Sequence, residues 1–351
     1  MSASVPGIDF ERLTPWFRGN VAAVDELRAE IIGHGRSNLT YRVHAEDKSW
    51  VLRRPPLSHV QPTAHDMKRE FRVISALAAT DVPVPGTVAL CEDTTINDAP
   101  FYIMEYVDGF VPADSAEFER RFDEAHRRRT ADQLIDILVH LHSVVPADVG
   151  LGDFGKPEGY LERQVRRFSE QLARVKTRET PDLEEMARRL ASALPAKSGG
   201  GIVHGDYRLD NCILDNEGRI IAVLDWEMAT LGDPLADVGL LMMYWADSGA
   251  GGNLAVPGIA STAVTALPGF PSREEVTVRY AERSGRDLSS LDFYTVLAHF
   301  KLAVILENMH ARFLAGGTVG TGFEVIGQYS QLLASRGLEI ANGSPVAALR
   351  G

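Results

Sequence analysis

The chain has 351 residues, of which 45% are hydrophobic and 24% charged, a globular composition that is long enough for two domains. Its formal net charge of −12 argues against nucleic acid or an anionic membrane surface as its main partner, because both would repel it. The two cysteines, Cys91 and Cys212, form no CxxC pattern, so we expect buried free thiols in a reducing compartment. No stretch approaches the ~20 apolar residues of a spanning helix, and the first residues carry no signal-peptide pattern. We therefore expect a cytoplasmic protein without a membrane partner.

The first third of the chain has the pattern of a small antiparallel sheet. We expect the element order strand, strand, strand, helix, strand, strand. The helix is predicted over residues 65–80, where Phe71, Ile74 and Leu77 recur at helical spacing.

After residue 108 the pattern changes, and amphipathic helices dominate the rest of the chain. We place a boundary there, which gives domains 1–108 and 109–351. Asp233 and Asp237, in the segment GDPLADVG, are interpreted as a helix start, because Asp followed by Pro is favoured at that position. The predicted helices cover residues 130–145, 160–175, 181–194, 234–246, 273–285, 291–315 and 323–337.

The segment 203–227, VHGDYRLDNCILDNEGRIIAVLDWE, combines acidic residues with two short strand patterns. The turn DNEG between the apolar runs predicts a hairpin, which would bring Asp225 close to the loop that holds Asp206 and Asn211. Oxygen ligands of this kind bind Mg²⁺ together with substrate phosphates. In the alternative interpretation, the acids of this segment are ordinary turn residues. The full spacing, with Asp-Trp-Glu downstream, favours a site.

The pattern HGDYRLDN…LDWE, followed by GDPLADVG, resembles the aminoglycoside phosphotransferase family of the protein-kinase-like superfamily. Within that family, the chain is similar to the branch related to the kinase domains joined to some acyl-CoA dehydrogenases. The resemblance implies an α+β, two-lobed protein-kinase-like fold, with a small antiparallel-sheet lobe and a larger helical lobe. It also implies that residues 1–108 bind the nucleotide and that residues 109–351 carry the catalytic and substrate-binding groups.

Residue by residue, the resemblance places Asp206 at the catalytic base that orients the attacking hydroxyl. Asn211 and Asp225 fall on the two magnesium-binding positions. His204 matches a structural histidine that braces the loop, which agrees with its place beside Gly205 at a strand end.

In the first lobe, Arg53 of WVLRRPP occupies the position of the kinase lysine that binds phosphates. Strand alternation allows only one of Arg53 and Arg54 to face the nucleotide, and the sequence leaves open which one does. Glu70 is the expected partner on the helix, with a solvent-exposed surface charge as the alternative.

Two further segments are expected to contact the nucleotide. The loop GHGRSNLTY has the position of a glycine-rich cover loop, which points to Gly35, Ser37 and Asn38 as phosphate-binding residues. The segment FYIMEYVDG has the position of the hinge between lobes, where Glu105 and Val107 would bind adenine through their main chains. The alternative is a plain edge strand that leads to a turn.

Arg208 lies two residues after Asp206, where many protein kinases carry a lysine that touches the transferred phosphoryl group. One hypothesis is therefore that Arg208 stabilises charge on that group or binds an anionic part of the substrate. The alternative is a salt bridge to Asp210 or Glu227.

Taken together, the resemblance implies a small-molecule kinase that uses ATP and Mg²⁺ and transfers the γ-phosphoryl group to a hydroxyl. The acceptor is expected to be a hydroxyacyl-CoA, an amino alcohol or an aminoglycoside. The basic segments 126–129 and 166–167 either meet phosphates of such an acceptor or are solvated helix faces. A second reading is a nucleotide-binding regulatory module without transferase activity, against which the complete set of Asp206, Asn211 and Asp225 argues.

Overall fold

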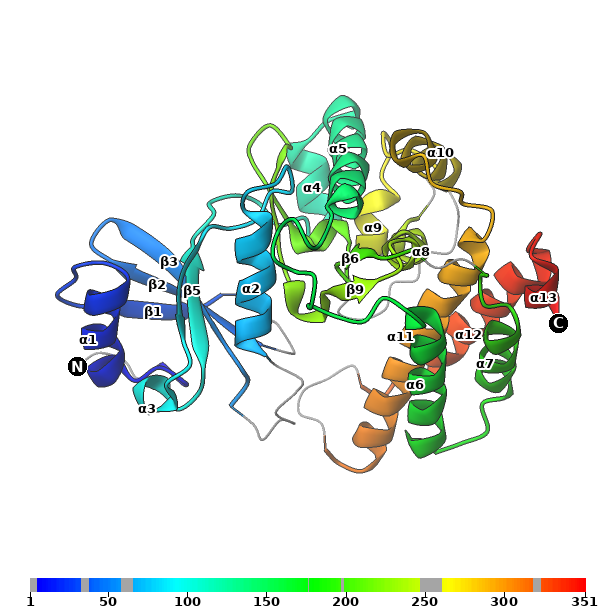
Figure 1. Ribbon diagram of the computed structural model, residues 1–351, viewed down its shortest axis with the longest axis horizontal. Coiled ribbons are helices and arrows are strands. Elements are labelled where there is room, and N and C mark those ends of the chain that lie inside the picture. The colour runs from blue at the N-terminus through cyan, green and yellow to red at the C-terminus, as the bar shows by residue number, and fades with distance from the viewer. Residues whose placement is uncertain are drawn as a thin grey trace. The chain divides into compact units, whose positions relative to one another are not determined.

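The computed structural model (Figure 1) describes residues 5–32, 38–57, 66–175, 177–196, 199–246, 261–317 and 323–351. The chain divides into two compact units. The first comprises Met1–Gly109 together with Ile221–Ala229, and the second comprises Phe110–Ile220 together with Thr230–Gly351. The predicted domains are continuous in sequence, whereas the first compact unit takes in a later segment. The assignment of functions to the two domains stays a prediction.

The first unit is built on a five-stranded sheet whose strand order is β1-β2-β3-β5-β4, with antiparallel neighbours. The predicted order of strands and helix is confirmed, and two short helices at the start and before β5 were not predicted. The elements are α1 (Phe10–Asn20), β1 (Arg28–Ile31), β2 (Leu39–Ala45), β3 (Lys48–Arg54), α2 (Met67–Leu77), β4 (Thr87–Cys91), α3 (Thr94–Asn97), β5 (Phe101–Glu105) and the 3₁₀ turn η2 (Trp226–Met228).

The two faces of this sheet have different coverings. Leu13 and Phe17 of α1 pack into an apolar cluster with Leu52 of β3 and Phe101 of β5. Because side chains alternate along a strand, Arg53 projects from the face opposite to Leu52. Helix α2 contacts β4 and β5 (Figure 1), and its buried positions include a charged side chain.

The second unit is mainly helical, as predicted. All seven helices predicted in this part of the chain are present. The helices are α4 (Ser115–Arg121), α5 (Glu124–Ser143), α6 (Tyr160–Val175), α7 (Pro181–Ser192), α8 (Leu235–Tyr244), α9 (Ser261–Thr265), α10 (Arg273–Ser284), α11 (Leu291–Leu314), α12 (Ile326–Gly343) and α13 (Ala347–Arg350).

Short strands and turns connect these helices. Strand β6 (Gly201–Val203) pairs with β9 (Thr230–Gly232), and a 3₁₀ turn η1 (Leu209–Asn211) precedes β7 (Cys212–Leu214). The predicted turn follows β7 and leads into β8 (Ile220–Val223). The Asp215 side chain closes it, since its Oδ1 atom accepts the backbone N–H groups of Glu217 and Arg219, both at 2.9 Å.

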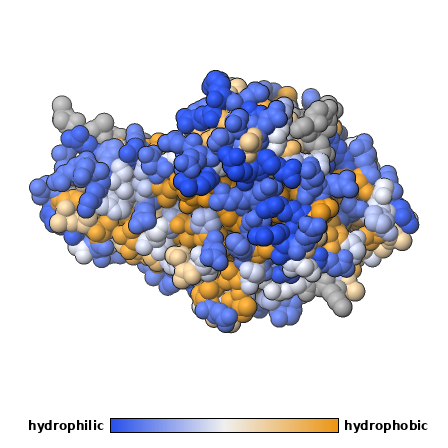
Figure 2. All heavy atoms as spheres, turned by 90° about the horizontal axis from the view of Figure 1, so that it is seen from above, coloured by the Kyte–Doolittle hydropathy of each residue, from blue (hydrophilic) through white to orange (hydrophobic). Residues whose placement is uncertain are grey.

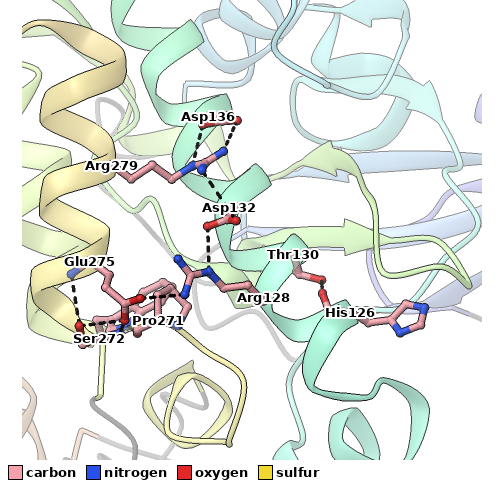
Figure 3. Close-up of polar contacts among 10 residues, drawn as sticks. His126, Arg128, Thr130, Asp132, Asp136, Pro271, Ser272, Glu275 and Arg279 are labelled. Atoms are coloured by element: carbon pink, nitrogen blue, oxygen red, sulfur yellow. Dashed lines mark hydrogen bonds and ion pairs between the residues drawn. The ribbon is translucent and has the colours of Figure 1, made fainter.

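Ion pairs join α5 to α10 on a hydrophilic surface (Figures 2 and 3). Arg279 binds Asp136 through two nitrogens, at 3.0 and 2.8 Å. Arg128 lies 2.8 Å from Glu275 and 3.3 Å from Asp132. The network accounts for one basic residue of the segment 126–129 as a structural contact rather than a ligand site.

Both cysteines, Cys91 and Cys212, are buried free thiols, as expected. Burial raises the pKa of both thiols, which keeps them protonated and unreactive. Among the described residues, the longest apolar helices fall short of what a membrane crossing requires.

Helix α8 approaches α11 closely at Gly239. A Cβ atom there would lie 2.5 Å from the carbonyl carbon and 2.6 Å from the carbonyl oxygen of Tyr294, which are backbone atoms that cannot rotate away. We expect Gly239→Ala to lower the free energy of unfolding by about 1–3 kcal/mol through overpacking, measured by thermal and urea unfolding. Gly343→Ala is the matched control in α12, because no atom lies within 4 Å of its added Cβ. Equal stability of the two variants would contradict this account of the packing.

Candidate functional site

The predicted site residues form two groups, each within one compact unit. One group surrounds Arg53 in the first unit, and the other surrounds Asp206 in the second unit.

Arg53 is surrounded by carboxylates. Its Nε lies 3.2 Å from Glu70 Oε2, and its Nη2 lies 2.5 Å from Asp225 Oδ1 and 3.5 Å from Glu227 Oε2. Burial lowers the pKa of Arg53, but these carboxylates outweigh it and the pKa is raised, so the guanidinium stays charged. Three acids around one arginine leave an excess of negative charge that a cation would offset.

The neighbouring Arg54 points to the other face of the sheet. It is buried, and its guanidinium donates to the backbone carbonyls of Gly7 and Asn97, the latter at 3.1 Å. Of the two arginines that the sequence left open, Arg53 is therefore the one that faces the helix α2. The reason is strand alternation, since Arg53 and Arg54 are consecutive in β3.

Glu70 is almost fully buried, with 2% of its surface exposed, so it is not a solvent-exposed surface charge. Burial raises its pKa to about 7, while Arg53 opposes the shift and Asp225 and Glu227 add to it. Neither carboxylate oxygen has a hydrogen-bond partner of good geometry among the described residues. The ionised form of Glu70 is therefore stabilised by its ion pair with Arg53, and the Tyr102 side chain also lowers the pKa of Glu70.

Asp225 has a left-handed backbone, with φ 65° and ψ 59°, which is uncommon for a residue with a side chain. Its carboxylate is 31% exposed, and Glu227 lies two residues later with 17% of its side chain exposed. Asn38 is buried and donates from Nδ2 to Glu227 Oε2 at 2.8 Å. Glu227 was not among the predicted site residues, although its spacing of two residues from Asp225 was a visible signal.

In the second unit, the loop around Asp206 is tied by its own side chains. Asn211 Nδ2 donates to the backbone carbonyl of Asp206 at 2.8 Å and to its carboxylate at 3.0 Å. Arg208 lies 3.2 Å from the same carboxylate and 2.7 Å from Asp210 Oδ2. The guanidinium also lies over the ring of Tyr244, 5.2 Å from its centroid. The predicted ion pair to Asp210 is thus present, and it does not preclude a contact to substrate, because 17% of the Arg208 side chain is exposed.

Asp237 is more than the helix-start residue that its sequence context suggested. It is buried, and its carboxylate accepts the backbone N–H groups of His204 at 2.7 Å and Gly205 at 2.8 Å. His142 Nε2 lies 3.3 Å from the same carboxylate, and the other His142 nitrogen lies 2.7 Å from the Tyr280 hydroxyl. Asp237 therefore fixes the backbone immediately before Asp206, a role that helix-capping rules do not reveal.

His204 has the bracing position that the resemblance implied. It is fully buried, and its Nδ1 atom accepts the backbone N–H of Asp206 at 3.2 Å. Its buried ring therefore supports the loop, as a structural histidine should.

The remaining predicted residues lie in the first unit. Gly35 and Ser37 fall outside the described residues. The backbone N–H of Glu105 donates to the Gly86 carbonyl at 2.8 Å, so this group is occupied within the sheet. Val107 follows β5 and is half-buried.

The donor atoms suit magnesium. Asn211 uses its amide nitrogen toward Asp206, which leaves its Oδ1 as an oxygen ligand, and Asp225 offers a half-buried carboxylate. In the described ranges, no three His, Cys, Asp or Glu side chains are grouped so as to hold a metal alone. Mg²⁺ usually takes one or two protein oxygens and completes its shell with phosphates and water, so each of these two groups by itself has the chemistry of a magnesium ligand.

The raised pKa of Glu70 predicts a pH-dependent stability. A carboxyl whose folded pKa lies above its unfolded value of 4.5 contributes stability below pH 4.5, and this contribution is lost as the pH rises through about 7. We expect Glu70→Gln to melt at a higher temperature than the wild type at pH 8 and at a similar temperature at pH 4.5. Each kcal/mol of difference in the free energy of unfolding should shift the melting temperature by about 2–4 °C.

Glu185→Gln provides a control of opposite sign. Hydrogen bonds from Arg188 and Arg189 lower the pKa of the half-buried Glu185 to about 2, so its contribution to stability is present above pH 4.5 and is lost as the pH falls toward 2. We therefore expect Glu185→Gln to be less stable than the wild type at pH 8. A Glu70→Gln difference that stays constant with pH would refute the assignment.

Comparison with known proteins agrees with this arrangement. The model of a phosphotransferase enzyme family matches residues 28–275. Acyl-CoA dehydrogenase family member 10 of Mus musculus is 34% identical over 311 residues, which are 88% of this chain and 28% of that protein. Family member 11 of Homo sapiens is 31% identical over 313 residues, again 88% of this chain and 39% of that protein. The chain thus spans less than two fifths of these relatives.

Solved structures share the fold. A crystal structure from Ralstonia eutropha, assigned to the aminoglycoside phosphotransferases, is 33% identical with a TM-score of 0.80, covering 95% of this chain and 98% of that one. A complex of an aminoglycoside phosphotransferase with streptomycin and ATP has a TM-score of 0.56 at 17% identity, covering 86% and 91% of the two chains, which supports the fold alone. These matches confirm the two-lobed kinase-like fold and the branch that the sequence suggested. The chain belongs to the phosphotransferase enzyme family, in the branch that includes the kinase-like parts of the acyl-CoA dehydrogenase family members.

Proposed function

We propose that the protein transfers the γ-phosphoryl group of ATP, with Mg²⁺, to a hydroxyl group of a small molecule. The observation that carries the proposal is the loop 204–211. In this loop the amide of Asn211 and the guanidinium of Arg208 both lie within hydrogen-bond distance of the Asp206 carboxylate. The buried Asp237 accepts a backbone N–H group of the same loop.

Asp206 is the proposed base. Its carboxylate accepts a hydrogen bond from the acceptor hydroxyl and so aims the oxygen at the γ-phosphorus. The new phosphorus–oxygen bond forms as the bond to the bridging oxygen of ADP breaks, and the hydroxyl proton passes to Asp206. Asn211 holds the Asp206 carboxylate at 3.0 Å, which limits the positions it adopts.

Asn211 and Asp225 are the proposed magnesium ligands. Bound Mg²⁺ would supply positive charge that offsets the negative charge on the phosphates. The excess of carboxylates around Arg53 supports this assignment, because Asp225 carries charge that a single arginine does not balance.

The first unit is the proposed nucleotide site. Arg53, held by Glu70, would bind phosphate oxygens once Asp225 turns to a cation. Gly35, Ser37 and Asn38 are proposed to cover the phosphates. Adenine would lie against the main chain of the segment 105–107, with Val107 and the Glu105 carbonyl as its hydrogen-bonding groups.

The acceptor is proposed to be a hydroxyacyl-CoA, an amino alcohol or an aminoglycoside. Relatives named as acyl-CoA dehydrogenase family members favour the first of these. Within the basic segments, two arginines are engaged by other groups of the protein. Arg127 donates to the carbonyls of Pro268 and Glu119, and Arg166 lies 3.9 Å from Glu170.

The alternative function is a nucleotide-binding regulatory module without transfer. A module that only binds nucleotide would not need a general base. The hydrogen bond by which Asn211 holds the Asp206 carboxylate therefore favours the enzyme. A coupled assay of ADP release with the three acceptor classes tests the choice. ATP binding without any acceptor-dependent ADP release would favour the regulatory module.

Asp206→Asn should abolish transfer while leaving the fold and nucleotide binding intact, because the amide cannot accept the proton. We expect turnover to fall by about 10²–10⁴, the usual contribution of a general base, with an unchanged dissociation constant for ATP. Asp215→Asn is the control, since Asp215 only closes the turn before β8. Transfer by Asp206→Asn at the wild-type rate would overturn the mechanism.

Arg208→Ala distinguishes a role toward substrate from a role in structure. If Arg208 contacts the phosphoryl group, turnover or a Michaelis constant should change by roughly 10-fold or more, as for a charge-assisted hydrogen bond. Because Arg208 also pairs with Asp210, the double variant Arg208→Ala, Asp210→Asn removes both charges of that pair. Recovery of activity in the double variant would show that the salt bridge alone mattered.

A further inference from the structure

Lys301 of α11 is a cation without a carboxylate partner in the part of the chain that the structure describes. It is half-buried, and its Nζ lies 5.5 Å from the centroid of the Phe168 ring. Burial lowers its pKa, Asp237 and Asp206 raise it, and Arg167 lowers it further. A half-buried ammonium group that makes no ion pair has lost part of its hydration without compensation, and an oxygen of a ligand would supply that compensation.

Lys301 lines a small cavity beside the loop that carries Asp206. Gly205 and Asp237 form one side of this cavity, and Tyr160 and Tyr294 contribute aromatic walls. Its volume is about 10 Å³, enough for about one water molecule. It can therefore receive a single oxygen atom at the edge of a larger molecule, but not a sugar ring.

The negative charge near this cavity is already engaged. Asp237 binds two backbone N–H groups and lies 3.3 Å from His142, and Asp206 is held by Arg208 and Asn211. Neither carboxylate makes an ion pair with Lys301 within hydrogen-bond range among the described residues. The ammonium group thus remains able to donate hydrogen bonds to an incoming oxygen.

We propose that Lys301 is an acceptor-binding residue that sets specificity: its ammonium group binds a carbonyl or carboxylate oxygen of the molecule whose hydroxyl Asp206 orients. The inference rests on the proposed phosphotransferase function and adds to it the residue that selects the acceptor. A cation here attracts an acyl oxygen and repels ammonium groups, so a polyamine such as an aminoglycoside is disfavoured.

The test compares the binding of four probes to the 351-residue protein: 3-hydroxybutyryl-CoA, 3-hydroxybutyrate, 1,3-butanediol and kanamycin. Binding is measured by calorimetry in the presence of MgADP, and transfer is measured as acceptor-dependent ADP release from ATP. We expect the two acyl probes to bind more tightly than the diol and kanamycin. Comparing the affinities for the thioester and for the free carboxylate shows whether Lys301 binds a carbonyl oxygen or a carboxylate oxygen.

Lys301→Met should weaken binding of the acyl probes by about 10- to 100-fold, the range for a hydrogen bond to a charged group, with the affinity for ATP unchanged. Lys156→Met is the matched control, since Lys156 is exposed. In Lys301→Ala, added methylammonium should restore part of the acyl-probe affinity, which a purely structural role would not allow.

Each outcome decides the proposal. It is overturned if Lys301→Met binds the acyl probes as the wild type does, if kanamycin or the diol binds preferentially, or if none of the four probes binds. Failure of the proposed function looks different: the acyl probes bind in a Lys301-dependent way, but ADP is not released. Transfer to the diol that is insensitive to Lys301→Met would instead leave the function intact and remove the specificity role.

Discussion

The buried carboxylate of Asp237 is the interaction on which the candidate catalytic loop depends. Burial by itself raises the pKa of this group, but the His142 contact and the backbone N–H groups outweigh burial, and the pKa is lowered. The carboxylate therefore stays ionised inside the protein, where it satisfies two consecutive backbone donors at His204 and Gly205. Without it those donors would be buried and unpaired, and the position of Asp206 would no longer be set by the helix α8.

The charged and polar side chains of the loop that Asp237 fixes also contact one another. Arg208 bridges Asp206 and Asp210, and Asn211 closes the same loop through its amide nitrogen. These contacts restrict the positions that the Asp206 carboxylate can adopt. Lys301 differs from these groups, because among the described residues this cation makes no ion pair, and we propose that it binds an oxygen of the acceptor.

In the first unit, by contrast, negative charge is in excess around Arg53. Arg53 is shared by three carboxylates, of which Glu70 is the most buried. Such a cluster is costly in the absence of further positive charge, because each additional acid raises the pKa of Glu70. On the proposed assignment, a cation at Asp225 would relieve this cost and free Arg53 to bind phosphate oxygens, and metal binding would then be coupled to nucleotide binding. The same acid excess makes the unit sensitive to pH near neutrality.

Local sequence patterns were enough to predict the order of strands and helices, because alternation of apolar residues and helical spacing are local properties. The sequence also determined the candidate residues Asp206, Asn211 and Asp225, whose spacing in one short segment is characteristic of the family. Other features needed the tertiary structure. The orientation of Arg53 rather than Arg54 depended on which face of the sheet α2 covers. Asp237 and Lys301 lie 31 and 95 residues after Asp206 in the sequence, and only the packing of α8 and α11 brings them to its loop. Local pattern cannot reveal such contacts, because they arise from side chains that meet only when distant helices pack.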